Sequence, residues 1–248
     1  MTMTTMLKSF ISPDWPAPSK VRALSTTRHG GVSAGPFASF NVGDHVGDVP
    51  ECVAQNRALL RRALPDEPLW LQQVHGTQVR HAGAGQGIIQ ADACVAQQPG
   101  AVCAIMTADC LPVLFCDCSG ERVGAAHAGW RGLAAGVLEQ TLDAMGGGQD
   151  RVMAWLGPAI GADAFEVGDD VRQAFLLHSP LAAPAFRPSG AGKWLADLYL
   201  LARQRLAAAG VKAVYGGDFC TYSDSGRFFS YRRDGITGRM ASLIWLAD

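Results

Sequence analysis

The sequence carries little charge and no excess of either sign. Charged residues make up 17% of its 248 positions, with 21 Lys and Arg against 22 Asp and Glu. This balance gives no basic surface for nucleic acid or for an anionic membrane. No apolar run approaches the roughly 20 residues that a spanning helix needs, and Met1–Lys8 is not followed by the apolar stretch of a secretory signal. We therefore expect a cytoplasmic protein without nucleic-acid or membrane partners.

Cysteine pairs with the spacing of a zinc knuckle are also absent. Cys116 and Cys118 are separated by one residue instead of two, and no second pair follows, which argues against a structural zinc site there. The count of seven cysteines is odd. Together with the missing export signal, this favours free thiols in a reducing compartment over a disulfide framework.

What the sequence does contain is enough apolar residues for one large domain with its own core. Strands are expected at 21–28, 69–82 (one strand or a pair), 91–97, 101–117 with a break at 109–112, 122–127, 151–156, 211–215, 228–232 and 240–246. Helices are expected at 50–64, 129–145, 169–177 and 194–209. Because strands outnumber helices, we expect an α/β or α+β layered domain with mixed sheets.

Three residues at the ends of expected strands are candidates for a metal centre. They are His75, Cys110 and His127, which are separated by 35 and 17 positions. Two imidazoles and one thiolate are a zinc ligand set that leaves the fourth tetrahedral position open. The same residues also suit a metal-free cysteine hydrolase, with Cys110 as nucleophile and a histidine as its base. A third interpretation gives each of them an ordinary place in a core or turn.

Two carboxylates have a functional and a structural interpretation. Asp109 precedes Cys110 and could orient a metal ligand, or could accept backbone N–H groups in a turn. Asp92 carries the same two interpretations. Arg131 lies where a helix is expected to begin, which suits a phosphate or carboxylate ligand, although a solvated arginine is equally common there.

Two further segments add polar residues. The Gly-, Ser- and Asp-rich stretch 28–48 contains Asn41 and is expected to be a long loop of the kind that often lines an active site. Arg233 and Arg239 lie near a glycine-rich turn late in the chain. By themselves these arginines indicate no more than surface charge.

Several motifs together resemble a known family, the bacterial YfiH-type laccase-domain proteins, also called multicopper polyphenol oxidases and peptidoglycan editing factors. The resemblance extends from 26 to the last expected strand. Its segments are LQQVHG (71–76), ADA (91–93), TADCLPVLF (107–115), AAHAGWRG (125–132), GPAIG (157–161), CTYSD (220–224) and FFSYRRDGITGRMAS (228–242).

The resemblance implies a single four-layered α/β/β/α domain over 1–248 that binds zinc through His75, Cys110 and His127. It implies phosphorolysis of adenosine, inosine and S-methyl-5′-thioadenosine, and deamination of adenosine. Purine nucleosides and phosphate are then the partners of a monomer. On this hypothesis Arg131, Arg233 or both hold phosphate, Asn41 helps to position the nucleoside, and Asp109 is a catalytic residue beside the metal ligands.

The older family name implies copper-dependent phenol oxidation instead. The chain has six histidines and no His-x-His pair, too few for a type 1 site plus a trinuclear cluster, so zinc fits the residues better. Copper could still occupy the centre in vitro, since it binds nitrogen and sulfur ligands more tightly than zinc does. The editing name leaves two alternatives open: the metal-free cysteine hydrolase acting on peptidoglycan precursors, and a non-catalytic ligand sensor.

Overall fold

A mixed six-stranded sheet forms the centre of the protein, whose computed structural model describes residues 10–83 and 89–248. Within these residues its strand order is β13 (Ala213–Gly216), β9 (Val152–Leu156), β7 (Leu111–Asp117), β8 (Val123–Ala128), β5 (Ala93–Ala96) and β3 (Val79–His81). The outer pairs β13–β9 and β3–β5 are parallel, and the inner pairs are antiparallel. Strands β5, β7, β8 and β9 are buried throughout, as expected for a sheet covered on both faces.

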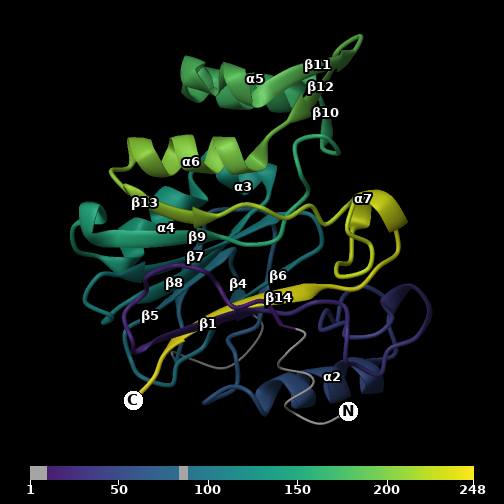
Figure 1. Ribbon diagram of the computed structural model, residues 1–248, viewed down its shortest axis with the longest axis vertical. Helices are drawn as coiled ribbons and strands as arrows, with labels where there is room; N and C mark the ends of the chain where they lie inside the picture. Colours follow the sequence, from purple (N-terminus) through teal and green to yellow (C-terminus); the bar gives the residue numbers. More distant parts are fainter. Residues whose placement is uncertain (1–9, 84–88) are drawn as a thin grey trace.

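A smaller antiparallel sheet packs on one face of this central sheet (Figure 1). It contains β1 (Val21–Ser25), β14 (Met240–Leu246) and β6 (Cys103–Thr107). Apolar side chains of the two sheets form one core between them. Helix α2 (Pro50–Arg61) covers the outer face of the small sheet through Leu60.

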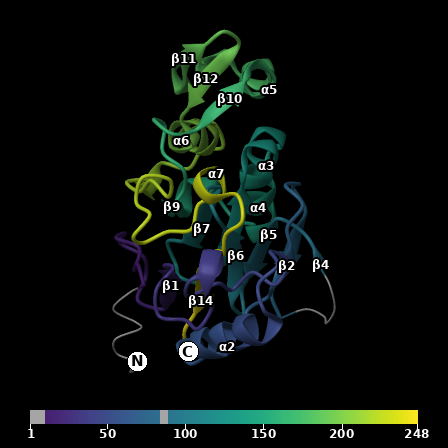
Figure 2. The same ribbon diagram turned by 90° about the vertical axis from the view of Figure 1, so that its right-hand side faces the viewer.

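Helices cover the opposite face of the central sheet (Figure 2). They are α3 (Trp130–Ala135), α4 (Val137–Met145) and α6 (Leu198–Ala208). A third sheet of β10 (Glu166–Gly168), β12 (Lys193–Ala196) and β11 (Phe186–Gly190) lies beyond them with α5 (Asp169–His178), at the top of Figure 1. Two short parallel strands, β2 (Leu71–Gln72) and β4 (Ile89–Gln90), form a separate pair.

The expectation of a mixed α/β protein with mixed sheets is therefore confirmed. The four-layered arrangement stays a prediction, because the third sheet with α5 lies outside the layers described above. All seven cysteines are free thiols, as expected. Within the described residues no helix is both long and apolar enough to span a bilayer. The prediction for Met1–Lys8 lies outside the residues that the structure describes.

Three predicted elements are wrong in part. The helix expected at 129–145 is interrupted at Gly136, whose φ of 101° separates α3 from α4. The helix expected from 194 begins only at Leu198, because Asp197 caps it by accepting from the Leu200 N–H at 2.9 Å, and Lys193–Ala196 is strand β12 instead.

The strand expected at 228–232 is the third error. Residues 231–234 form the short helix α7 (Tyr231–Asp234). Ser230 caps this helix, since its hydroxyl accepts from the Arg233 N–H at 3.2 Å. The strand break predicted near Pro112 is confirmed: β6 ends at Thr107, and β7 begins at Leu111.

Candidate metal centre

Two loops and the end of one strand bring together His75, Cys110 and His127. His75 follows β2, Cys110 lies in the break between β6 and β7, and His127 is the next-to-last residue of β8. One ligand atom from each side chain lies within 4.8 Å of the other two. Residues that are far apart in sequence therefore converge as a group that could hold a metal ion.

The chemistry and spacing of this group fit a tetrahedral ion. The Cys110 Sγ lies 3.7 Å from the His75 Nε2. Zinc bonds of about 2.3 Å to sulfur and 2.0–2.1 Å to nitrogen at a tetrahedral angle require a separation of about 3.6 Å. His75 is exposed while His127 is buried, so the group opens to solvent on the His75 side.

Asp92 fixes the orientation of both histidines. Its Oδ1 lies 2.9 Å from the Nδ1 of His127, which places the proton on Nδ1 and leaves Nε2 as the ligand atom. The fully buried carboxylate also accepts the N–H groups of Val74, His75 and Gly76 at 2.7–3.1 Å. These bonds hold His75 in a turn where its φ is 60°. Both interpretations of Asp92 therefore hold, because it accepts the backbone N–H groups of a turn and also contacts a candidate ligand.

Gly129 is the residue that sequence reasoning missed altogether. A Cβ at this position would lie 2.7 Å from the His75 Cδ2 and 3.1 Å from the Cys110 Sγ. The residue precedes α3 and follows β8, so the backbone of this turn passes directly against two of the candidate ligands. Its φ of −59° is ordinary, which makes the requirement for glycine purely steric.

Charges within the group favour the protonation state that a metal needs at sulfur. Burial would raise the pKa of the Cys110 thiol, but the positive charge of His127 and hydrogen bonds from both histidines lower it to about 6. Burial would likewise lower the pKa of His127, but Cys110 and Asp92 raise it to about 9. Cys110 is therefore a thiolate at neutral pH even before it binds a metal.

Asp109 connects Cys110 to the last part of the chain. It has a φ of 90° in the strand break. Its Oδ1 accepts from the Thr221 hydroxyl and its Oδ2 from the Arg232 N–H, both at 2.6 Å. The carboxylate is buried, and both of its oxygens accept hydrogen bonds from other parts of the chain. These contacts support the interpretation of Asp109 as a structural residue of the turn.

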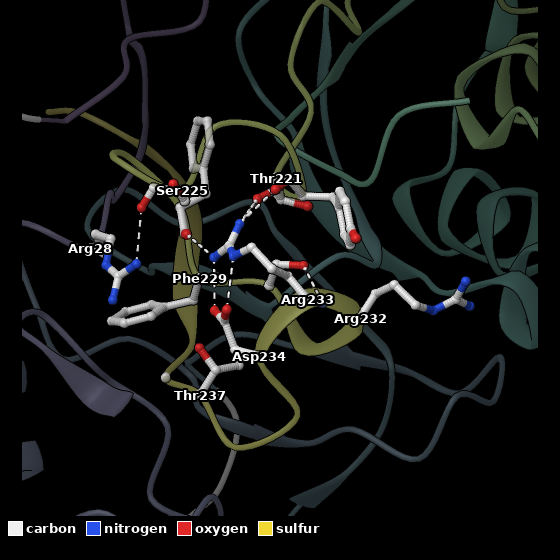
Figure 3. Close-up of polar contacts among 12 residues, drawn as sticks. Arg28, Thr221, Ser225, Phe229, Arg232, Arg233, Asp234 and Thr237 are labelled. Carbon is white, nitrogen blue, oxygen red and sulfur yellow. Dashed lines mark hydrogen bonds and ion pairs between the residues drawn. The ribbon is translucent and has the colours of Figure 1, made fainter. Parts of the chain in front are cut away.

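Arg233 binds its own chain with every donor it has (Figure 3). Its Nη1 donates to the carbonyls of Thr221 and Tyr222 at 2.7 and 2.8 Å, and its Nη2 to that of Phe228 at 2.9 Å. Nε and Nη2 also form a bidentate pair with Asp234 at 2.8 Å. To contact phosphate, Arg233 would have to give up one of these bonds.

The other two candidates for substrate contact have different surroundings. Arg131 is exposed in the first turn of α3, with its guanidinium carbon 4.4 Å from the ring centre of Trp130. Asn41 is fully buried and its amide is bound within the chain. Its Oδ1 accepts from the N–H groups of Gly43 and Arg239 at 2.9 and 2.8 Å. Asn41 therefore holds its own loop and the backbone of Arg239 in place.

A cavity of about 450 Å³ opens at Gln73, two residues before His75. Its other side is formed by His45, Arg57, Trp70 and Met106. The guanidinium carbon of Arg57 lies 4.3 Å from the ring centre of Trp70. This volume falls in the range of small-molecule sites.

The fold and the donor set define a class of protein: mixed α/β proteins with a candidate His–Cys–His metal centre. Residues 22–247 match the family described as multi-copper polyphenol oxidoreductase laccase, and the chain belongs to this family. The resemblance found in the sequence motifs is thereby confirmed.

Its relatives cover the whole domain. The chain is 56% identical over 243 residues to a purine nucleoside phosphorylase of Pseudomonas aeruginosa, with 98% of this chain and 100% of the relative covered. It is 54% identical over 243 residues to the purine nucleoside phosphorylase YfiH of Escherichia coli, with 97% and 100% covered.

Solved structures show the same fold. A crystal structure of a Neisseria meningitidis protein matches with a TM-score of 0.93 and 54% identity, over 97% of this chain and 100% of that one. YlmD from Geobacillus stearothermophilus matches with a TM-score of 0.83 and 33% identity, over 94% of each chain.

Proposed function

We propose that this chain is a zinc-dependent purine nucleoside phosphorylase, built as a single four-layered α/β/β/α domain over 1–248. The observation that carries the proposal is the convergence of His75, Cys110 and His127, with Asp92 orienting His127. Relatives named purine nucleoside phosphorylase support the reaction. Adenosine, inosine and S-methyl-5′-thioadenosine are the proposed substrates, with deamination of adenosine as a second activity of a cytoplasmic monomer.

The donor set indicates how the chain would serve this chemistry. A zinc ion held by His75, Cys110 and His127 would supply Lewis acidity and one open position. Asp92 keeps the His127 proton on Nδ1, so that Nε2 stays available. Phosphorolysis forms a bond from a phosphate oxygen to C1′ and breaks the bond from C1′ to the base nitrogen. The chain must therefore bind an anion and a nucleoside side by side.

The test combines metal and product analysis on one preparation. The purified protein is analysed for zinc and copper and is then given each nucleoside with and without phosphate. We expect about one zinc per chain and phosphate-dependent ribose 1-phosphate. Cys110→Ala should lose both the metal and the turnover. Full phosphorolysis by metal-free Cys110→Ala would overturn the proposal, and phenol oxidation by a copper-loaded sample without phosphorolysis would favour the laccase alternative.

One observation favours a second candidate, a metal-free cysteine hydrolase acting on peptidoglycan precursors. The Cys110 thiol has a pKa lowered to about 6, and His127 beside it is bonded to Asp92, which is the arrangement of a nucleophile, its base and an orienting carboxylate. This candidate predicts that metal-free protein forms a covalent adduct at Cys110 with an acyl-type electrophile and turns over. Loss of all activity on metal removal would reject it.

A further inference from the structure

Arg239 is a half-buried arginine whose charge has no carboxylate partner within residues 10–83 and 89–248. It lies directly before β14. Its Nη1 donates to the carbonyls of Thr237 and Gly238 at 3.0 and 3.1 Å. Its Nε and Nη2 have no acceptor in the described part of the chain. These two nitrogens form one edge of the guanidinium, the edge that binds a phosphate or carboxylate with two parallel bonds.

The charge of this side chain interacts with the candidate metal centre. Burial lowers the pKa of Arg239, while the negative charges of Cys110 and Asp109 act on it in the opposite direction. The guanidinium carbon lies 6.0 Å from the ring centre of Tyr231, in the helix α7 that Asp109 holds through the Arg232 N–H. Arg239 therefore lies near the segment that Asp109, the neighbour of Cys110, holds in place, and it has an open pair of donors.

The loop that contains Asn41 fixes this position. The Arg239 N–H donates to the Asn41 Oδ1 at 2.8 Å, and its carbonyl accepts from Val42 at 3.3 Å. A Cβ on Gly43 would lie 2.7 Å from the Arg239 Cγ, so the loop packs directly against the arginine stem. The Asn41 Nδ2 is bound to Gly43 and Asp48, which leaves the amide no role except to hold this loop and Arg239.

Arg131, Arg233 and Arg239 differ in the donors they can offer. All donors of Arg233 are engaged within the chain, and Arg131 is exposed and stacked on Trp130. We propose that Arg239 binds phosphate beside the metal centre through Nε and Nη2, and that Asn41 acts through it as a positioning residue. This inference rests on the proposed phosphorolysis and names the anion subsite of that reaction.

The kinetic test compares the phosphate KM of metal-loaded variants at saturating inosine. Arg239→Met should raise the phosphate KM about 100-fold, the loss expected for a bidentate charged hydrogen bond. Arg239→Lys keeps the charge but lacks the second donor, so its phosphate KM should lie between those of Arg239→Met and the wild type. Metal content and the nucleoside KM should not change. Arg187→Met is the matched control, since Arg187 forms an exposed ion pair with Asp163.

Asn41→Ala tests the positioning role. It should raise the phosphate KM while leaving the nucleoside KM and the metal content in place. A merely structural contribution would lower the amount of active enzyme and leave the phosphate KM of the remainder unchanged. That result would remove Asn41 from the proposal.

Direct phosphate binding separates this inference from the proposed function. Inorganic phosphate is titrated with metal-loaded protein, without nucleoside, and followed by ³¹P NMR. If the wild type binds phosphate, Arg239→Met does not, and no ribose 1-phosphate forms once a nucleoside is added, the subsite stands and the proposed function falls. An unchanged phosphate KM together with unchanged phosphate binding in Arg239→Met would overturn the inference. So would a loss of phosphate binding that is seen only in Arg131→Met, or a wild-type protein that does not bind phosphate.

Discussion

Two regions contribute to the candidate site, the group of His75, Cys110 and His127 and the arginine-rich segment 227–239, and they differ in what determines each side chain's role. In the first region the residue types narrow the role to two, because a thiolate beside two imidazoles suits either a metal ion or nucleophilic catalysis. In the second region one residue type serves two purposes. Arg233 binds only its own chain, and Arg239 presents an unused edge of its guanidinium.

The comparison teaches that charge alone does not identify an anion-binding residue. What decides is whether the chain's own carbonyls and carboxylates have already taken the donors. Arg233 and Arg239 are six positions apart, yet of the two only Arg239 has donors without an acceptor in the described residues.

Among the variants near the candidate ligands, Gly129→Ala is expected to have the largest effect on metal binding. The added methyl group would meet the His75 ring at 2.7 Å and the Cys110 sulfur at 3.1 Å, so the two ligands cannot keep their places. We expect metal content to fall from about one per chain to near zero, with unchanged far-UV circular dichroism. Gly226→Ala is the control, since its nearest neighbour would be 3.7 Å away. A fully metal-loaded Gly129→Ala protein would show that the ligand geometry is wrong.

On the arginine side, Arg233→Met should strongly destabilise the protein. It would leave the carbonyls of Thr221 and Phe228 and the carboxylate of Asp234 without their donors. We expect a loss of about 3 kcal/mol in the free energy of unfolding, measured by urea denaturation.

The control for this prediction is Arg227→Met. Arg227 forms a half-exposed ion pair with Asp224, and surface pairs contribute about 1 kcal/mol or less. Equal stability losses in both variants would contradict the role of Arg233 as a structural residue. A raised phosphate KM in a folded Arg233→Met would return that residue to substrate binding.

The part of the site that was predictable from sequence depends on rare residue types and strand ends. Cys110 was placed in a break that Pro112 and Asp109 indicated, and the structure has this break between Thr107 and Leu111. The part that was not predictable depends on tertiary contacts. The contacts of Asp92 join three consecutive N–H groups to a histidine 35 positions away, and no local pattern signals this arrangement.

The same reasoning explains the errors in the fold. The segment 228–232 has the aromatic content of a strand, but the hydroxyl of Ser230 caps a helix there and Asp109 holds its second residue. The sheet of β10, β11 and β12 was missed because its strands are short and mostly exposed, so they lack an apolar periodicity. Gly129 could not be predicted either, because any residue can adopt its φ and glycine is required only by the side chains that pack against it in the folded protein.

Asp92→Asn should have a smaller effect on metal binding than Gly129→Ala. The amide keeps the shape but removes the negative charge that holds the His127 Nδ1 proton. Loss of this kind of support typically weakens metal binding by about 10–100-fold. In metal-free protein the pKa of His127 should fall from about 9, because Asp92 is one of the two groups that raise it. Metal titration and histidine NMR measure the two effects, and no change in either would contradict the assigned tautomer.

Thr237→Val tests whether a buried polar group in the arginine-rich segment lacks a hydrogen-bond partner. Thr237 is 2% exposed, and its hydroxyl has no hydrogen-bond partner in the described residues. A buried hydroxyl without a partner costs about 1 kcal/mol or more, so valine of the same shape should raise the melting temperature by about 2–4 °C. The control is Thr141→Val in α4, which removes a hydroxyl that donates to the Val137 carbonyl at 2.6 Å and should not stabilise. If Thr237→Val lowers the melting temperature, its hydroxyl has a partner, and the donors of this segment are more fully engaged than the contacts of Arg239 indicate.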